Sequence, residues 1–123
     1  MIDSSDPRFI TKANQLKVDK SWGYEIWIAN SPLYCGKKLF IKHNHCSSQH
    51  FHMRKTETLY VVSGRLKLDL WENAQTTTLM LEKGDSFLIT PGLVHKLTAP
   101  DGDVVLHEFS TEHFDDDSYR IAR

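Results

Sequence analysis

Residues 49–64 read QHFHMRKTETLYVVSG, and they contain two histidines at a spacing with a structural meaning. On an extended strand, residues i and i+2 point to the same face, so His50 and His52 would project side by side. Neutral imidazole is a good ligand for a divalent transition metal. The apolar run at residues 59–62, ended by Gly64, predicts a second strand. The two histidines are therefore candidate metal ligands at the end of one strand, just before the next.

Glu57 is a third candidate ligand, because a carboxylate oxygen also suits a divalent metal. It follows His52 by five residues. On one continuous strand this spacing would give Glu57 the wrong parity to join the two histidines. We therefore expect a turn at residues 53–55, which would separate the histidine pair from the glutamate and let all three side chains converge.

Residues 84–95 read GDSFLITPGLVH and supply a fourth candidate. The apolar residues 87–89 predict a short strand, and Pro91-Gly92 predicts a turn. His95 then enters the next strand. We interpret His95 as the residue that completes the site formed by the first three candidates.

The composition limits the classes of protein to be considered. Residues 1–123 are expected to form one domain, which is large enough to bury a single core. The formal charge of −1 gives no reason to expect nucleic-acid binding. No apolar run approaches the length of a signal peptide or a membrane span. With only Cys35 and Cys46 present, we expect a reduced, cytoplasmic protein rather than a disulfide, and Cys46 as a soft metal ligand is the less favoured alternative.

Short strands, punctuated by glycine and proline, recur along the chain. Alternating or apolar runs predict strands at residues 20–28, 37–42, 65–71, 76–81, 87–89, 96–98 and 104–109. Trp22 and Trp27 are expected to belong to the core. Residues 1–20 are expected to form an edge strand or an N-terminal arm, and residues 111–123 a mostly irregular tail whose acidic run, 115–117, is a solvated face. The absence of a long amphipathic pattern indicates an all-β sandwich or barrel.

The two segments resemble the two signature motifs of the cupin family. H-x-H followed by E and G in residues 44–64, and G-D-x-x-x-I-x-P-G-x-x-H in residues 84–99, have the order and spacing of that family. Three departures, Asn44 for Gly, Thr90 for Pro and Ala99 for Asn, remove no ligand. The resemblance implies a single-domain double-stranded β-helix, which is the cupin jelly-roll barrel. The metal ligands that it implies are His50, His52, Glu57 and His95.

A narrower resemblance is to cupin sugar isomerases. The pattern H-x-H-x-x-K-x-E, which includes Lys55, resembles D-lyxose isomerase, and residues 107–110 (HEFS) are similar to the E-V-S segment of those enzymes. Residues 20–25 (KSWGYE) resemble the K-P-W-G-x-E segment of type II mannose-6-phosphate isomerases, with Ser21 in place of Pro. The resemblance implies metal-dependent aldose–ketose isomerisation, with Glu108 as the acid/base and Lys55 stabilising the developing oxyanion.

Other interpretations of the same residues remain open. An oxygen-using enzyme of this fold would need an apolar, aromatic-lined pocket, for which Phe51, Phe87 and Phe109 are candidates. A non-catalytic module would bind metal and ligand without turnover. Glu108 could be an exposed strand acid and Lys55 a solvated lysine, and a metal-assisted hydride shift competes with proton transfer. An acid at position 108 that faces the metal would favour the isomerase.

The sequence also leads to expectations about the substrate, the oligomeric state and the metal. We expect a small-molecule substrate, a sugar or a sugar phosphate, with no nucleic acid and no membrane. The resemblance implies a homodimer, which is also expected because a short jelly roll leaves edge strands to cover. The metal would be a divalent transition metal, with zinc, manganese, iron, nickel and cobalt left open. A phosphorylated sugar would need a basic contact, for which Arg54, Arg65 and Arg120 are candidates, whereas His107 and His113 are not expected to be ligands.

Overall fold

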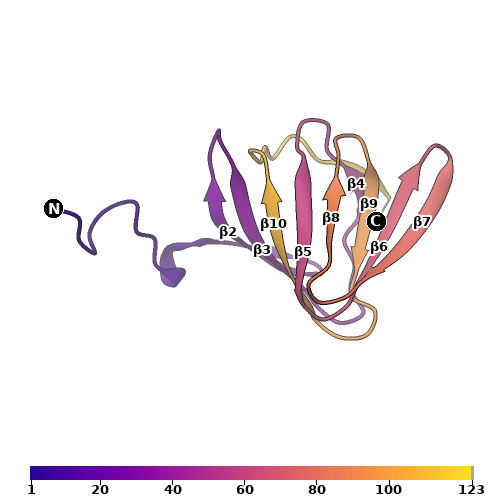
Figure 1. Ribbon diagram of the computed structural model, residues 1–123, viewed down its shortest axis with the longest axis horizontal. Coiled ribbons are helices and arrows are strands. Elements are labelled where there is room, and N and C mark those ends of the chain that lie inside the picture. Colours follow the sequence, from indigo (N-terminus) through magenta and orange to yellow (C-terminus); the bar gives the residue numbers. More distant parts are fainter. Residues whose placement is uncertain (123) are drawn as a thin grey trace.

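The computed structural model describes residues 1–122, which form two antiparallel β-sheets (Figure 1). The six-stranded sheet has the order β1-β2-β3-β10-β5-β8, and the five-stranded sheet has the order β11-β4-β9-β6-β7. The strands are β1 (Leu16–Lys20), β2 (Gly23–Asn30), β3 (Cys35–Ile41), β4 (Gln49–Phe51), β5 (Glu57–Ser63), β6 (Leu66–Glu72), β7 (Gln75–Leu81), β8 (Ser86–Ile89), β9 (Val94–Thr98), β10 (Val104–Ser110) and β11 (Tyr119–Ala122). A short 3-10 turn, η1 (Lys12–Asn14), precedes β1. The predicted all-β class is confirmed.

The core lies between the sheets and is built by strands that alternate strictly. In β6, Leu66, Leu68 and Leu70 are buried, whereas the residues between them are partly exposed. Leu39 and Ile41 of β3 are buried in the same way. Successive side chains of a strand point to opposite faces, so this pattern buries one face and leaves the other to solvent. The alternation predicted from the sequence is confirmed in both strands.

Two tight connections fix how the strands meet. Asn73 and Ala74 have φ angles of 54° and 63° and connect β6 to β7, as in the two-residue hairpin turn in which both residues adopt positive φ. Gly64, directly after β5, has a φ angle of 81°. A Cβ at this position would collide with the backbone oxygen of Asp103. Glycine is therefore required where the end of β5 passes the start of β10.

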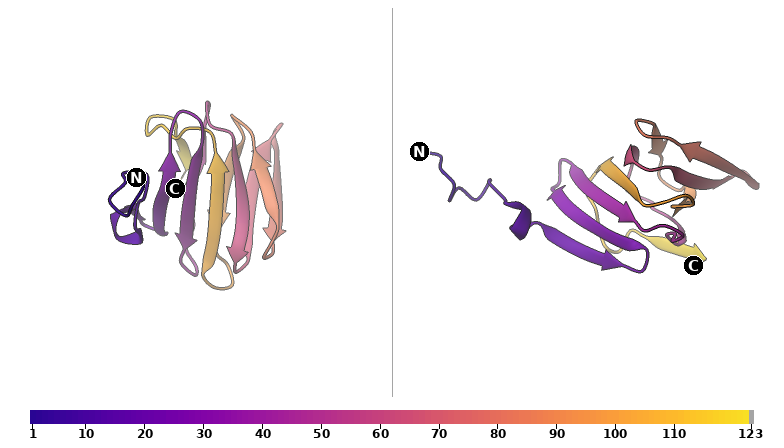
Figure 2. Two further views of the ribbon diagram at one scale, coloured as in Figure 1. Left: turned by 60° about the vertical axis from the view of Figure 1, so that its left-hand side comes forward. Right: turned by 90° about the horizontal axis from the view of Figure 1, so that it is seen from below.

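The N-terminal segment contains both of the expected features. Leu16–Lys20 forms β1, which is the edge strand of the six-stranded sheet and pairs with β2. Residues 1–11 extend away from the barrel (Figure 2). Among the described residues, no helix has the length and apolar character needed to cross a membrane.

The C-terminal segment is mostly irregular, as expected, over residues 111–118, but residues 119–122 form the strand β11. β11 pairs with β4, which places Tyr119 opposite Phe51 and Arg120 opposite His50. The rings of Tyr119 and Phe51 stack with centroids 5.1 Å apart. β11 was not predicted because it has no buried residue, so its strand structure depends on backbone pairing with a distant segment rather than on an amphipathic pattern. This pairing bears on the site, because β4 carries His50.

Candidate metal centre

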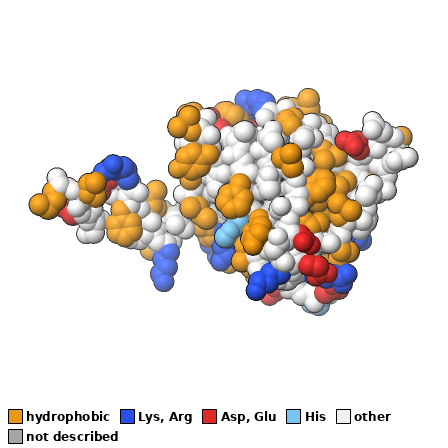
Figure 3. All heavy atoms as spheres, viewed as in Figure 1, with side chains coloured by type: hydrophobic (Ala, Val, Ile, Leu, Met, Phe, Trp, Pro, Cys, Tyr) orange, Lys and Arg blue, Asp and Glu red, His pale blue; other side chains and the backbone are white. Residues whose placement is uncertain are grey.

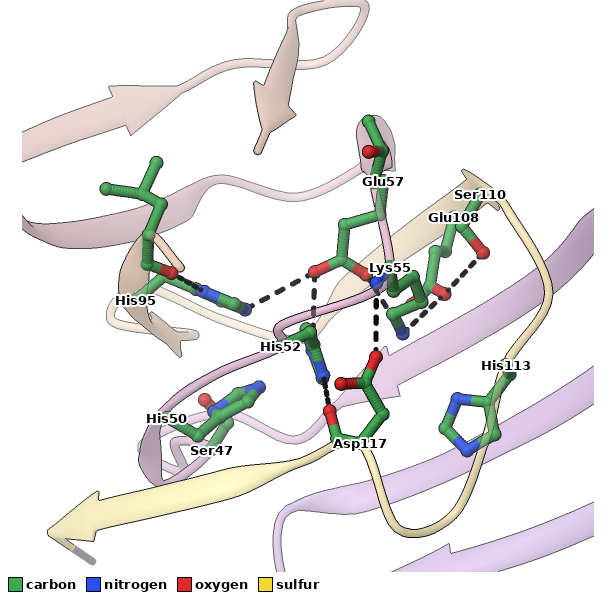
Figure 4. Close-up of polar contacts among 12 residues, drawn as sticks. Ser47, His50, His52, Lys55, Glu57, His95, Glu108, Ser110, His113 and Asp117 are labelled. Carbon is green, nitrogen blue, oxygen red and sulfur yellow. Dashed lines mark hydrogen bonds and ion pairs between the residues drawn. The ribbon is translucent and has the colours of Figure 1, made fainter. Parts of the chain in front are cut away.

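Three histidines converge beside β4 and β9 (Figure 4). His50 lies in β4 directly opposite His95 of β9, and the ring of His52 lies 5.1 Å from that of His50. One ring nitrogen from each of the three lies within 4.8 Å of the other two. Among the described residues, His107 and His113 do not belong to this group. The histidine ligands implied by the sequence are thus brought together.

The backbone sets the orientation of all three rings. Each Nδ1 lies within hydrogen-bond distance of a main-chain carbonyl, which can only accept. The acceptors are Ser48 O for His50 (2.8 Å), Asp117 O for His52 (2.8 Å) and Leu93 O for His95 (2.9 Å). Each Nδ1 must therefore carry the proton, which leaves each Nε2 with a free lone pair. Such outer hydrogen bonds are typical of metal-binding histidines, so the arrangement fits a metal ion.

Glu57 adjoins the histidine group from the first position of β5. Its Oε1 lies 3.3 Å from His95 Nε2 and 3.7 Å from His52 Nε2. The chain bends at Met53 and Arg54, between β4 and β5, where a turn was expected from the parity of Glu57. Burial opposes ionisation, but the contact with His95 and the charge of Lys55 hold the pKa of Glu57 well below its usual range. Three imidazoles suit zinc or a similar divalent transition metal, and Glu57, which lies outside the group of three but beside His95, is a candidate fourth ligand.

The electrostatics keep the histidines in the state that binds metal. Burial, together with the neighbouring His95, lowers the pKa of His50 to about 4. Burial and the nearby Lys55 ammonium also lower the pKa of His52. At neutral pH both rings are therefore neutral, and a metal has no proton to displace from them.

Lys55 and Glu108 form a buried ion pair next to this centre (Figure 4). Lys55 Nζ lies 3.0 Å from Glu108 Oε2 and 3.3 Å from Glu57 Oε2. Ser110 Oγ donates a further hydrogen bond to Glu108 Oε2 at 3.2 Å. Burial, reinforced by the charge of Glu57, raises the pKa of Glu108 to about 7. Burial alone would lower the pKa of Lys55, but Glu108 and Glu57 outweigh it and raise that pKa.

The interpretation of Glu108 as an exposed strand acid is wrong, and so is that of Lys55 as a solvated lysine. Each residue is only 4% exposed. In β10 the buried positions are Val104, Leu106 and Glu108, whereas Phe109 is 57% exposed. The inward face of β10 thus begins as apolar core and ends as a polar wall of the site.

A cavity of about 460 Å³ lies between the sheets and is lined by the three histidines, Glu57, Lys55 and Glu108. Trp22 also lines it and packs against the core. The aromatic lining considered for an oxygen-using enzyme is not formed by the expected residues: Phe51, Phe87 and Phe109 are not part of the wall. The described wall is mainly polar or charged around the metal centre.

The remaining candidate residues are the three arginines expected to contact a phosphate and the two cysteines. Arg120 lines the cavity, whereas Arg54 and Arg65 form ion pairs elsewhere on the surface. Cys35 and Cys46 are both free thiols. Cys46 lines the cavity but lies outside the histidine group among the described residues.

Asp117 is a functional residue that the sequence analysis missed. It was expected to lie on a solvated face, but it is 2% exposed, whereas Asp115 and Asp116 do reach solvent. Its carboxylate accepts hydrogen bonds from the backbone N–H groups of Met53, Arg54 and Lys55 at 2.9–3.1 Å. Its own carbonyl orients His52. An aspartate within an acidic run carries no sequence signal for such a role.

Two sheets enclosing a buried three-histidine site define a β-barrel protein with a candidate metal centre. The sequence profile of the cupin domain matches residues 40–109, and the chain therefore belongs to the cupin family. A search of curated protein sequences found no match.

Solved structures with the same fold support this assignment. The capsular polysaccharide assembling protein CapF from Staphylococcus aureus superposes with a TM-score of 0.81 at 20% identity, over 99% of this chain and 34% of CapF. Oxalate decarboxylase from Bacillus subtilis gives 0.81 at 12% identity, over 91% of this chain and 31% of that enzyme. KdgF from Halomonas sp. gives 0.73 at 19% identity, over 88% of this chain and 96% of KdgF. The chain thus spans about a third of the first two proteins, and the likeness confirms the cupin jelly roll.

Proposed function

We propose that this cupin is a metal-dependent isomerase that interconverts an aldose and a ketose, with a sugar or a sugar phosphate as the substrate. The observation that carries the proposal is the Lys55–Glu108 pair, whose charged groups lie 3.0 Å apart in the wall of the cavity. The same lysine contacts Glu57, so the pair adjoins the metal centre. Proton transfer beside a polarised carbonyl needs an acid/base in this place.

The chemistry divides between the metal centre and Glu108. A divalent metal held by the three histidines and Glu57 would polarise the carbonyl and the adjacent hydroxyl of the sugar. Glu108 removes the proton from the carbon that bears this hydroxyl, and the electron pair of the broken C–H bond forms the double bond of an enediolate. Glu108 then returns the proton to the neighbouring carbon, while the hydroxyl proton moves from one oxygen to the other. The isomerisation is redox-neutral and needs no co-reactant.

The surroundings of Glu108 support this role. A pKa of about 7 lets one carboxyl group both accept and release a proton near neutral pH. The Lys55 ammonium, fixed between Glu108 and Glu57, is placed to stabilise negative charge that develops on a substrate oxygen.

Proton NMR of the purified protein tests the proposal. The protein is loaded in turn with manganese, zinc, nickel, cobalt or iron(II) and incubated with a panel of aldoses, ketoses and their phosphates. New anomeric signals are expected with at least one metal and one sugar. Glu108→Gln should lower turnover by about a thousandfold or more, within the range of general acid–base catalysis and its supporting electrostatics, while metal binding is retained.

Glu72→Gln is the matched control, because Glu72 is an exposed glutamate at the end of β6 and should leave turnover unchanged. Deuterium from heavy water should enter the product, since a proton passed through Glu108 exchanges with solvent, whereas a hydride shift would leave the product unlabelled. If no sugar of the panel gives new anomeric signals although metal is bound, the isomerase proposal is overturned. Oxygen uptake would then be measured.

A further inference from the structure

Lys37 is a buried lysine that the proposed reaction does not use. Its side chain is 1% exposed, and it lines the cavity. It shares the inward face of β3 with Leu39 and Ile41, at a position where an apolar residue would extend the core. Burying an ammonium is unfavourable unless its charge and its donors find partners.

The partners of Lys37 are mostly neutral. Its Nζ lies 3.0 Å from His113 Nδ1 and 4.3 Å from the centroid of the Trp27 ring. An ammonium can only donate, so His113 Nδ1 must accept and His113 Nε2 must carry the ring proton. Asp115 Oδ1, which lies 3.1 Å from that Nε2, is the acceptor of this proton. Lys37 is thus fixed in place by an imidazole and an aromatic face.

The nearest carboxylate, that of Glu25, forms an ion pair with Lys37 but no hydrogen bond. Glu25 Oε1 lies 3.6 Å from Lys37 Nζ, which is beyond hydrogen-bond distance. The same oxygen already accepts the indole N–H of Trp27 at 3.0 Å. An ammonium has three N–H groups, and within the described chain only His113 accepts one in a hydrogen bond. Donor capacity therefore remains for a ligand in the cavity.

The sheet places Lys37 beside the proposed acid/base. Lys37 of β3 is directly opposite Glu108 of β10, and Trp27 of β2 is directly opposite Lys37. Neighbouring strands are about 4.8 Å apart. A substrate whose reacting carbons lie at Glu108 would therefore bring a group a few atoms further along to the Lys37 ammonium.

The charges of the cavity favour a ligand that carries an anion. Four cationic and five acidic side chains line it, so a bound divalent metal would leave a net positive charge. Of the cationic residues, Lys20 and Arg120 are exposed, and Lys55 is occupied by two glutamates. Lys37 is the buried cation, among the described residues, with no carboxylate at hydrogen-bond distance.

We propose that Lys37, positioned by His113, binds an oxyanion of the substrate, either a carboxylate or a phosphate. This inference deepens and rests on the proposed function, because it assigns an acidic sugar rather than a neutral one to the same cavity. The metal centre, the Lys55–Glu108 pair and Lys37 all line the cavity in which the substrate would lie.

Equilibrium binding of simple anions tests the site without turnover. Inorganic phosphate and acetate are titrated separately into the full chain by calorimetry, in metal-free and zinc-loaded form, which tells the two kinds of oxyanion apart. Lys37→Met should weaken binding of at least one anion tenfold or more in both forms. Lys38→Met is the matched control, because Lys38 is on the opposite face of β3 and does not line the cavity, and it should bind as the wild type does.

The outcomes separate this inference from the proposed reaction. Equal anion affinity in wild-type protein and a folded Lys37→Met variant would overturn the Lys37 site, whatever the turnover. Anion binding that depends on Lys37, in a protein that isomerises no sugar, would support the site and reject the reaction. If Lys37→Met does not fold, Lys37→Arg keeps the charge but moves the donors. An unchanged affinity for both anions in that variant would also overturn the site.

Discussion

Burial keeps individual histidines of the metal centre in the neutral form that binds metal. A histidine in water is partly protonated just below neutral pH, but His50 and His52 have lowered pKa values because they are enclosed. The main-chain carbonyls fix the proton on Nδ1 in the neutral ring. Both effects direct the Nε2 lone pairs toward the centre, so little reorganisation is left for metal binding.

The lowered pKa of His50 predicts how the stability of the metal-free protein depends on pH. In the folded chain this pKa is about 4, against 6.5 for the free side chain. Between these values the unfolded chain binds more protons, so the stabilisation is complete above pH 6.5 and is lost as the pH falls toward 4. The expected loss is of the order of 3 kcal/mol. Urea unfolding at pH 7 and at pH 4.5 should show a smaller decrease in His50→Gln than in the wild type.

Comparing the wild type with His50→Gln separates the contribution of His50 to the pH dependence of stability from the opposite contribution of Glu108. The raised pKa of Glu108 makes the folded chain bind more protons between pH 4.5 and 7, so its contribution to stability falls as the pH rises. Glu108 is present in both proteins and largely cancels. His43→Gln, which changes an exposed histidine, is the control. If His50→Gln loses as much stability on acidification as the wild type, burial does not hold His50 neutral.

Individual site residues differ in how far the sequence could predict them. The positions of His50, His52 and Glu57 follow from strand parity and one turn, which are local properties of the chain. Glu108 was assigned by resemblance, and its burial depends on which face of β10 turns inward. Lys37 could have been found, because it has the parity of Leu39 and Ile41 in a predicted strand. Its contacts could not, since His113 comes from a loop 76 residues away.

At the scale of elements, the segment from Phe114 to β11 closes the site from outside. Asp117 binds the turn after β4 through its carboxylate and orients His52 through its carbonyl. β11 then pairs with β4, opposite His50. Two of the three histidines are therefore positioned by a segment more than 60 residues later in the chain.

Asp117→Ala should weaken zinc binding tenfold to a hundredfold, the usual cost of disturbing the groups that orient a metal ligand; the Asp117 carbonyl that accepts from His52 remains. The variant leaves three backbone N–H groups of the turn without their acceptor, so the turn and His52 lose their fixed position. Competition with a chromophoric chelator measures the affinity. Asp116→Ala is the control, because Asp116 is exposed. Asp117→Asn, which keeps an acceptor oxygen, should recover part of the affinity; wild-type affinity in Asp117→Ala would contradict the role.

Elements that bury their own apolar face were predicted, and elements that depend on a distant partner were not. β6 and β10 alternate within their own sequences, and each buries a row of apolar residues. β11 is exposed along its whole length, so its sequence contains no period to detect. The barrel itself followed from the number of short strands and from the two cupin motifs.

At the scale of the whole molecule, apolar side chains gather on the outer face of the six-stranded sheet (Figure 3). Tyr60, Leu88 and Phe109 are 39%, 54% and 57% exposed, and they lie on the neighbouring strands β5, β8 and β10. Phe9 and Ile10 are 57% and 50% exposed on the segment that extends away from its own barrel. Single exposed apolar residues are ordinary, but a group on adjacent strands is typical of an interaction surface.

We predict that a second copy of the chain covers this surface. The projecting segment of one copy points away from its own sheet, so a second copy that covers it would bury Phe9 and Ile10. Light scattering after size exclusion should give twice the 14.2 kDa mass of the chain. Phe9→Asp with Ile10→Asp should shift the mass to that of one chain, because charged side chains cannot be buried in an apolar contact. Leu33→Asp, at an exposed turn between β2 and β3, should leave the dimer intact. A wild-type mass of 14.2 kDa would refute the dimer, and a dimer that survives the double substitution would place the interface elsewhere.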